Sequence, residues 1–288
     1  MNSQIKLASA RTMRRMLLAA AALAAAVPLL AQEPPQPLSP GQLDNLVSRI
    51  ALYPDPLLAQ VLTASTFFDQ IPDAAAWADQ HSYLQGEQLA QAIQEDNVPW
   101  DPSVQALLAF PSVLDNMDRD MNWTRALGEA VLDSRADVID AVQRMRHRAS
   151  EYGYLRDCPQ YRVVADGPWI EIDPIDAGMI FVPVYDPYWV FAPPRPGFAI
   201  GISFGARIFI GAGFGAVGWL SPHFDWRAHA LIIDNHPWER NAMNRAAYVH
   251  PYRTPMARHP AAGARTYHET HAVHPTRSDR VEHREQRR

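Results

Sequence analysis

The spacing of apolar side chains changes near Gly153, and this change constrains the fold more than any other feature of the sequence. Before it, apolar residues recur every three to four positions, as they do on one face of a helix. After it come short runs rich in β-branched and aromatic residues, separated by turn-forming segments. These runs are residues 161–164, 169–172 and 179–185. The sequence therefore predicts an α+β protein, with a helical region at 41–152 and a smaller β region, rich in glycine and aromatic residues, at 153–239.

Two Asp-Pro pairs are predicted to start helices. Asp55-Pro56 and Asp101-Pro102 are each followed by apolar residues at the same offsets, which indicates either a diverged helical repeat or two uses of one helix start. We favour the second account, because an Asp side chain caps free N–H groups and Pro fits the first helical turn. Ser134 is predicted to start a further helix that ends near Ser150.

The N-terminus has the three-part pattern of a secretory signal peptide. A positive segment is followed by fifteen apolar residues at 16–30 and by Ala31, so cleavage is expected before Gln32. An apolar run of this length is short of the roughly 20 residues that a membrane helix needs. No Cys lies near the cleavage point, and Met13 departs from the twin-arginine pattern, so ordinary secretion is expected. A Pro-rich linker, residues 32–40, follows the signal peptide.

Charge is distributed unevenly along the mature chain. Residues 32–239 hold 12 Arg against 27 acidic residues, whereas residues 240–288 hold 10 Arg against 4 acidic residues, and six His. Such a C-terminal segment is predicted to be a disordered basic tail that can reach anionic surfaces. Cys158 is the single cysteine of the chain, so the fold cannot contain an intramolecular disulfide. No cofactor and no nucleic-acid partner are expected.

The glycine-rich apolar segment 199–220 has two interpretations. Its repeated Gly-x-x-x-Gly spacing suits helix pairing in a membrane, but Arg207 in its middle disfavours insertion by about 2.5–3.5 kcal/mol. We favour a glycine-rich β-hairpin and keep membrane association as the alternative. A further strand is expected at 230–234.

Several blocks of the sequence closely resemble the bacterial family known as domain of unknown function 3300. The most specific of them is residues 51–62, Ala-Leu-Tyr-Pro-Asp-Pro-Leu-Leu-Ala-Gln-Val-Leu. The others are residues 63–66, 99–104, 109–111, 122–128, 140–146, 181–187 and 203–205. The resemblance covers about residues 41–235 and implies an exported envelope protein. It implies no activity and no agreed active site.

One candidate for catalysis is Ser203. Residues 201–205 fit the Gly-x-Ser-x-Gly nucleophile elbow, and possible acid and base partners follow in the order that α/β-hydrolases use. These partners are Asp225 or Asp234, and His229 or His236. A glycine-rich strand that happens to contain Ser is the structural alternative. Glu171 with Asp173, on one face of a strand, and Cys158 are weaker candidates for acid–base and nucleophilic chemistry.

Two patterns could bind a metal ion. His268, His271 and His274 would lie on one side of an extended chain with three residues per turn, and imidazoles bind Zn, Cu or Ni. The residues that mimic an EF-hand are Asp118, Asp120, Asn122 and Glu129. That loop lacks its obligatory Gly, which favours a helix start with Asn122 as the cap.

Aromatic residues gather with prolines around residues 183–194, and Trp169 precedes them. Such a cluster either lines a groove for a glycan or an extended peptide, or packs the junction between the helical and β parts. The residues are Trp169, Pro183, Tyr185, Pro187, Tyr188, Trp189, Phe191, Pro193 and Pro194.

The expected function is that of a non-catalytic binding or scaffold protein, located in the periplasm or cell envelope or secreted. The alternatives are a periplasmic hydrolase acting through Ser203, or metal binding through the tail. The expected partner is an envelope protein, a glycan or an anionic surface.

Overall fold

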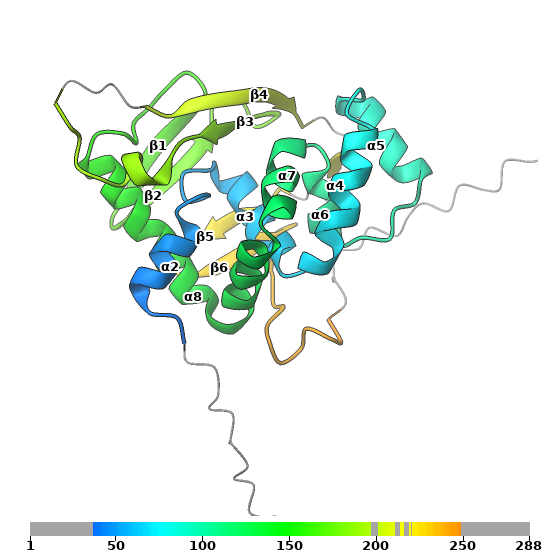
Figure 1. Ribbon diagram of the computed structural model, residues 1–288, viewed down its shortest axis with the longest axis horizontal. Coiled ribbons are helices and arrows are strands. Elements are labelled where there is room, and N and C mark those ends of the chain that lie inside the picture. Colours follow the sequence, from blue (N-terminus) through cyan, green and yellow to red (C-terminus); the bar gives the residue numbers. More distant parts are fainter. Residues whose placement is uncertain (1–36, 197–200, 211–213, 216–218, 220, 249–288) are drawn as a thin grey trace, which may run out of the picture.

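The computed structural model describes residues 37–196, 201–210, 214–215, 219 and 221–248. In this part the first half of the chain is helical and the second half forms small antiparallel sheets, which confirms the α+β prediction (Figure 1). The predicted signal peptide and most of the linker lie outside the described residues.

The helical half contains seven α-helices and one 3-10 turn among the described residues. They are α2 (Pro40–Val47), α3 (Asp55–Ser65), η1 (Phe68–Gln70), α4 (Ile71–Gln80), α5 (Gly86–Glu95), α6 (Pro102–Leu107), α7 (Pro111–Arg119) and α8 (Met121–Glu151). A short helix, α9 (Pro187–Val190), lies in the second half. Pro occupies the first turn of α2, α3, α4, α6, α7 and α9, where its missing N–H loses no bond.

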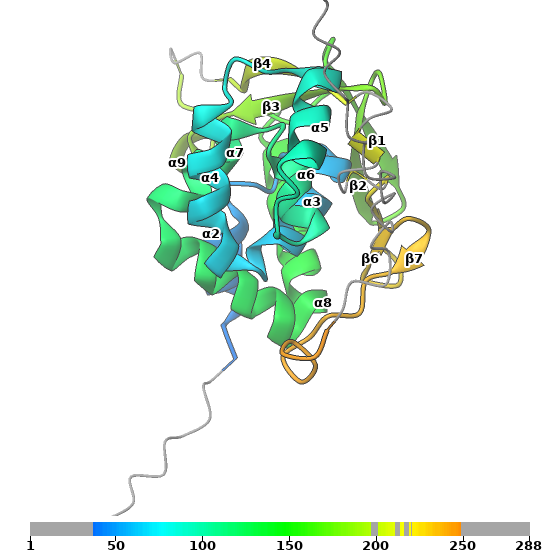
Figure 2. The same cartoon turned by 90° about the vertical axis from the view of Figure 1, so that its right-hand side faces the viewer.

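The strands form three small sheets in the part of the chain that the structure covers. They are β1 (Tyr161–Asp166), β2 (Trp169–Pro174), β3 (Met179–Val184), β4 (Ser203–Phe209), β5 (His223–Asp225), β6 (Ala230–Ile233) and β7 (His236–Pro237). β1 pairs with β2, β3 with β4, and β6 with both β5 and β7, always antiparallel. Both views show β3 and β4 lying across one end of the helical part (Figures 1 and 2).

Helix α3 lies at the centre of the molecule. All its residues except Pro56 are buried, and α6, α8, β2 and β5 pack around it. A helix covered on every side must be largely apolar, and its hydroxyl groups need partners. Thr63 Oγ1 accordingly donates to the Ala59 carbonyl at 2.7 Å, inside the same helix. The block that is most specific to the resemblance therefore forms the core of the fold.

Helix α8 is two helices joined at a kink. Ser134 has non-helical angles, φ −147° and ψ 61°, so the predicted helix start at Ser134 is the start of the second half. The first half begins at Met121, and its N-cap is Asp120, whose side chain accepts from the Trp123 N–H. The prediction that Asn122 is the cap is wrong, because Asn122 lies inside the helix.

The glycine-rich segment contributes a strand. Residues 203–209 form β4, whose partner in the described structure is β3, and the register shifts between Phe181 and Pro183. Much of the rest of segment 199–220 lies outside the described residues. Among the residues that are described, no helix is long and apolar enough to cross a membrane.

One hydrophobic core joins the two halves. Ile180 and Trp226 from the β half pack in the same cluster as the side chains of α3 and α8. The chain remains packed beyond the predicted tail boundary at Arg240, because Arg240 is buried and donates to the Thr66 carbonyl at 2.6 Å. Tyr248 then stacks edge-on against Trp238.

Candidate functional site

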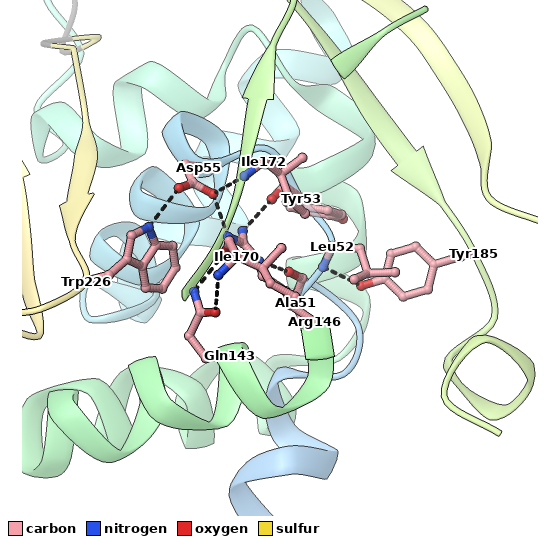
Figure 3. Close-up of polar contacts among 10 residues, drawn as sticks. All are labelled: Ala51, Leu52, Tyr53, Asp55, Gln143, Arg146, Ile170, Ile172, Tyr185 and Trp226. Atoms are coloured by element: carbon pink, nitrogen blue, oxygen red, sulfur yellow. Dashed lines mark hydrogen bonds and ion pairs between the residues drawn. The ribbon is translucent and has the colours of Figure 1, made fainter. Parts of the chain in front are cut away.

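A fully buried arginine, Arg146, lies under the turn that connects α2 to α3 (Figure 3). Its guanidinium donates to the carbonyls of Ala51, Tyr53 and Ile170 at 2.8–3.0 Å. Its Nη1 is also 2.7 Å from Oδ1 of Asp55. Arg presents five donors in a fixed fork, so one side chain can hold a turn, a helix start and a strand together.

The Asp55 carboxylate completes this buried network. It accepts from the Ile172 N–H at 3.2 Å and from Trp226 Nε1 at 3.1 Å, besides its ion pair with Arg146 (Figure 3). Burial raises the pKa of Asp55, and the charge of Arg146 opposes that shift. The prediction that Asp55 caps α3 is wrong, because Pro54 is the N-cap and the carboxylate makes no capping bond.

Two further groups close the network. Gln143 exchanges two hydrogen bonds with the main chain of Ile170, at 2.8 and 3.1 Å. The Trp226 ring lies 4.9 Å from the Arg146 guanidinium carbon, in a cation–π contact. Because Arg146 is fully covered, its guanidinium cannot meet a ligand, and the network fixes the segment Ala51–Tyr53.

Beside this fixed segment is a groove of about 400 Å³. One wall is helix α7, and the other is the end of β3 with the first residue of α9. The floor is apolar and includes Ile50, Val61, Val113, Met117 and Val182. Concave, mostly apolar sites with a few polar groups are typical of ligand binding.

Tyr53 and Tyr185 line the groove but differ in their hydroxyl partners. The Tyr185 hydroxyl donates to the Ser48 carbonyl at 2.9 Å and accepts from the Leu52 N–H at 3.3 Å. Tyr53 is only 4% exposed, and its hydroxyl has no hydrogen-bond partner within the described structure. Burial raises its pKa to about 12, so the hydroxyl stays protonated and can donate. The hydroxyl oxygen is not fully covered, so it can be reached from the groove, where a ligand or water can accept its hydrogen bond.

Two arginines lie at one end of the groove, and each is paired with a carboxylate. Arg49, half exposed at 51%, bonds Asp120 at 2.8 Å and lies 5.2 Å from the centre of the Trp123 ring. The pKa of Asp120 is lowered by the Trp123 N–H and by Arg49. Arg119 is 72% exposed, and its one ion-pair partner among the described residues is Asp115, one turn back on α7.

The structure places the predicted catalytic residues apart from this groove. Ser203 is the first residue of β4, whereas a nucleophile elbow requires a helix directly after the Ser. Its hydroxyl donates to the Val184 carbonyl at 3.0 Å. His229 contacts Asp140 at 2.8 Å, and His236 contacts the carbonyl of Asp234 at 2.6 Å. Asp225 accepts from the Ala228 N–H in a turn.

Of the acidic candidates, Glu171 lines a second hollow of about 460 Å³ over β2 and β5, whereas Asp173 does not. Glu171 and Asp173 share the outer face of β2, as predicted, and the pKa of Glu171 is raised by burial and then by Asp55 and Asp173. Cys158 is half-buried beside Tyr161.

No group of three metal-binding side chains forms among the residues that the structure describes. Asp118, Asp120 and Glu129 lie along α7 and α8, where Glu129 pairs with Arg245. The candidates His268, His271 and His274 lie outside the described residues.

Some residues of the aromatic and proline cluster pack in the interior, and others line the groove. Tyr185 and Phe191 contact each other and pack against both the main core and a smaller buried cluster that includes Leu52 and Tyr161, as the packing interpretation predicts. Trp169 packs edge-on against His229 at 5.5 Å, away from the groove. Pro183 and Pro187 do line the groove, and the exposed Val184 and Tyr188 lie at or next to it.

Comparison with known proteins supports the resemblance. The model of the family described as "protein of unknown function (DUF3300)" matches residues 39–264, and the chain belongs to this family. The chain is also similar to the uncharacterized protein YacH of Escherichia coli (strain K12), with 39% identity over 126 residues. That match covers 44% of this chain and 20% of the E. coli protein. No solved structure matches the chain at a significant level.

The sequence did not point to Arg146, Arg49 or the Tyr53 hydroxyl. A signal for two of them was present, because Tyr53 and Arg146 lie in blocks 51–62 and 140–146 of the resemblance. Which of these residues is buried and which faces a groove depends on contacts between segments about 90 residues apart, such as Arg146 with the Tyr53 carbonyl.

Proposed function

We propose that the mature chain is an exported, non-catalytic binding protein of the cell envelope, which holds its ligand in the groove between α7 and β3. The observation that carries the proposal is the Tyr53 hydroxyl, which lies on the floor of a groove with an otherwise apolar base and has no hydrogen-bond partner among the described residues. The signal-peptide pattern at residues 1–31 supports export.

Site-specific photocrosslinking in intact cells tests the binding role. A photoreactive amino acid at Asn116, an exposed position in the α7 wall, should give crosslinked products in the envelope fraction. The same amino acid at Glu87, exposed on α5, is the matched control and should give none. Equal products at both positions, or none at Asn116, would contradict the proposal.

The export and the lack of catalysis have separate tests. Mass spectrometry of the protein from cells should find an N-terminus at or near Gln32, and retention of Met1 would contradict export. Labelling by a fluorophosphonate that disappears in Ser203→Ala would establish the hydrolase alternative instead.

A further inference from the structure

The groove has two side chains that can only donate, Arg49 and Arg119, whereas Ser112, Asn116 and the Tyr53 hydroxyl can both donate and accept. Ser112, Asn116 and Arg119 are exposed on α7 at spacings of four and three residues, so they form one polar row along the α7 wall. Tyr53 adds a hydroxyl from the floor, and Arg49 adds a guanidinium at the end. The carboxylate at this end, Asp120, is already bonded to Arg49 and to the Trp123 N–H.

The opposite wall cannot extend its sheet by a regular added strand. The groove touches four consecutive residues, Val182 to Tyr185. Because side chains alternate between the faces of a strand, this contact means that the edge of β3 borders the groove. Pro183 lies in that edge, has no N–H, and adjoins the register shift at Phe181. Pro183 therefore offers a ligand no N–H at this point of the wall, which gives the side-chain donors a larger share of the binding.

These features suit a proline-rich peptide. Proline residues carry a carbonyl acceptor and no N–H donor, and an extended proline-rich chain leaves those carbonyls free. Its rings pack well against aromatic side chains such as Tyr53, Trp123 and Tyr185.

The chain itself contains a segment with this chemistry. Residues 32–38 read Gln-Glu-Pro-Pro-Gln-Pro-Leu, with a carboxylate at Glu33 beside the prolines. That charge complements Arg119, whose exposed pair with Asp115 is weak enough to exchange partners. The segment joins α2 at Pro40, whereas Arg49 follows the other end of that helix. In Figure 1 the chain enters α2 on the side of the molecule away from β3, which favours binding to another molecule.

We propose that the groove binds the Gln32–Leu38 segment of a second copy of this chain, with Glu33 placed against Arg119. This inference rests on the binding function proposed above and names its partner. It makes the protein a self-associating scaffold, in which each copy offers one segment and one groove. Two different surfaces that bind head to tail generate rings or open chains rather than a closed twofold dimer.

Charge reversal tests the pairing. Sedimentation of the mature chain over a concentration series should show reversible self-association. Arg119→Glu and Glu33→Arg should each weaken it by about tenfold, and the double variant should restore most of the loss. The control is Arg162→Glu, which reverses the charge of an exposed side chain on β1 away from the groove, and it should not change the self-association. Circular dichroism checks that each variant is folded.

A second measurement uses a probe that does not depend on the oligomer. A fluorescent peptide with the sequence of residues 32–38 should bind the mature chain, and Tyr53→Phe should weaken that binding. A monomer at all concentrations, or association that Arg119→Glu leaves unchanged, would overturn the inference. If crosslinks at Asn116 then identified another protein, the proposed binding function would stand while the self-association failed.

Discussion

At the scale of single residues, breaking the buried pair Arg146 and Asp55 is expected to cost much of the stability of the fold. Arg146 is fully covered, and Asp55 is the carboxylate that neutralises it. Removing one member of such a pair leaves the other buried without compensation, which costs about 3–5 kcal/mol. Asp101 lies in the same local sequence but caps α6 through the Ser103 N–H at 2.9 Å, and losing a cap costs about 0.5–2 kcal/mol.

We therefore predict that Asp55→Ala lowers the free energy of unfolding by several times more than Asp101→Ala. Urea denaturation of both variants measures the two losses, and the second variant is the matched control for the first. Equal losses would show that the buried pair contributes no more than a helix cap. Local sequence predicted the role of Asp101 correctly. It failed for Asp55 because the deciding partner, Arg146, comes from a distant helix.

The two groove tyrosines provide a second contrast. The Tyr185 hydroxyl bridges Ser48 and Leu52, so Tyr185→Phe leaves a carbonyl and an N–H without this partner. Such losses cost about 1–3 kcal/mol. Tyr53→Phe should leave stability nearly unchanged, because the Tyr53 hydroxyl has no partner within the described residues. Thermal unfolding of the two variants compares them directly. A large loss in Tyr53→Phe would mean that its hydroxyl has a structural role.

At the scale of elements, the contact between α3 and α8 depends on a glycine. A Cβ added at Gly128 would overlap the Ser65 carbonyl oxygen and lie 2.7 Å from the carbonyl carbon, so the helices can approach only without a side chain there. Gly128→Ala should destabilise by about 1–3 kcal/mol or more, as overpacked cores do. In Gly41→Ala, in α2, the added methyl group has no atom within 4 Å, so this substitution should be neutral or slightly stabilising. Similar denaturation midpoints for the two variants would contradict this account.

Strand β2 gives the stability a pH dependence through Glu171. Its pKa is raised above the ordinary value of 4.5, first by burial and then by nearby carboxylates. The folded state therefore holds this proton more tightly than the unfolded state does. The stability from this group is complete below the ordinary pKa and is lost as pH rises through the raised value. Glu171→Gln should raise the melting temperature at neutral pH and change it little at about pH 4. An equal gain at both pH values would rule out this cause.

The elements themselves were easier to predict than their partners. The Asp-Gly-Pro turn at 166–168 predicted the separation of β1 from β2, which do form a hairpin. Pairing of β3 with β4 was not predicted, because these strands are separated by α9 and a long connection. The alternation of apolar and polar side chains identifies a single strand. Which strand it pairs with depends on which strand faces are buried together in the fold, and the alternation does not show this.

At the scale of the whole molecule, composition identified the basic C-terminus but placed its start too early for the packing that is observed. A segment poor in large aliphatic residues is expected to stay outside the core. Arg240 nevertheless lies 3.6 Å from the centre of the Phe67 ring and bonds both oxygens of Thr66. The Ala242 N–H donates to the Leu132 carbonyl at 3.1 Å. Composition counts charged residues but cannot show that one of them has a buried site on the body.

Two truncations of the mature chain locate this boundary. A chain ending at Tyr248 keeps the Arg240 contacts and the stacking of Tyr248 on Trp238, so its melting temperature should match that of full length. A chain ending at Glu239 loses the Arg240 contacts and the Tyr248 ring. It also exposes the Trp238 ring, which is fully buried in the full-length chain. Its melting temperature should fall by about 4 °C or more, because roughly 1–3 kcal/mol of hydrogen bonds and aromatic contact is removed. Differential scanning calorimetry of the three chains measures the shifts. An unchanged melt in the chain ending at Glu239 would place residues 240–248 outside the cooperative unit. A lowered melt in the chain ending at Tyr248 would instead show that residues after 248 contribute to the core.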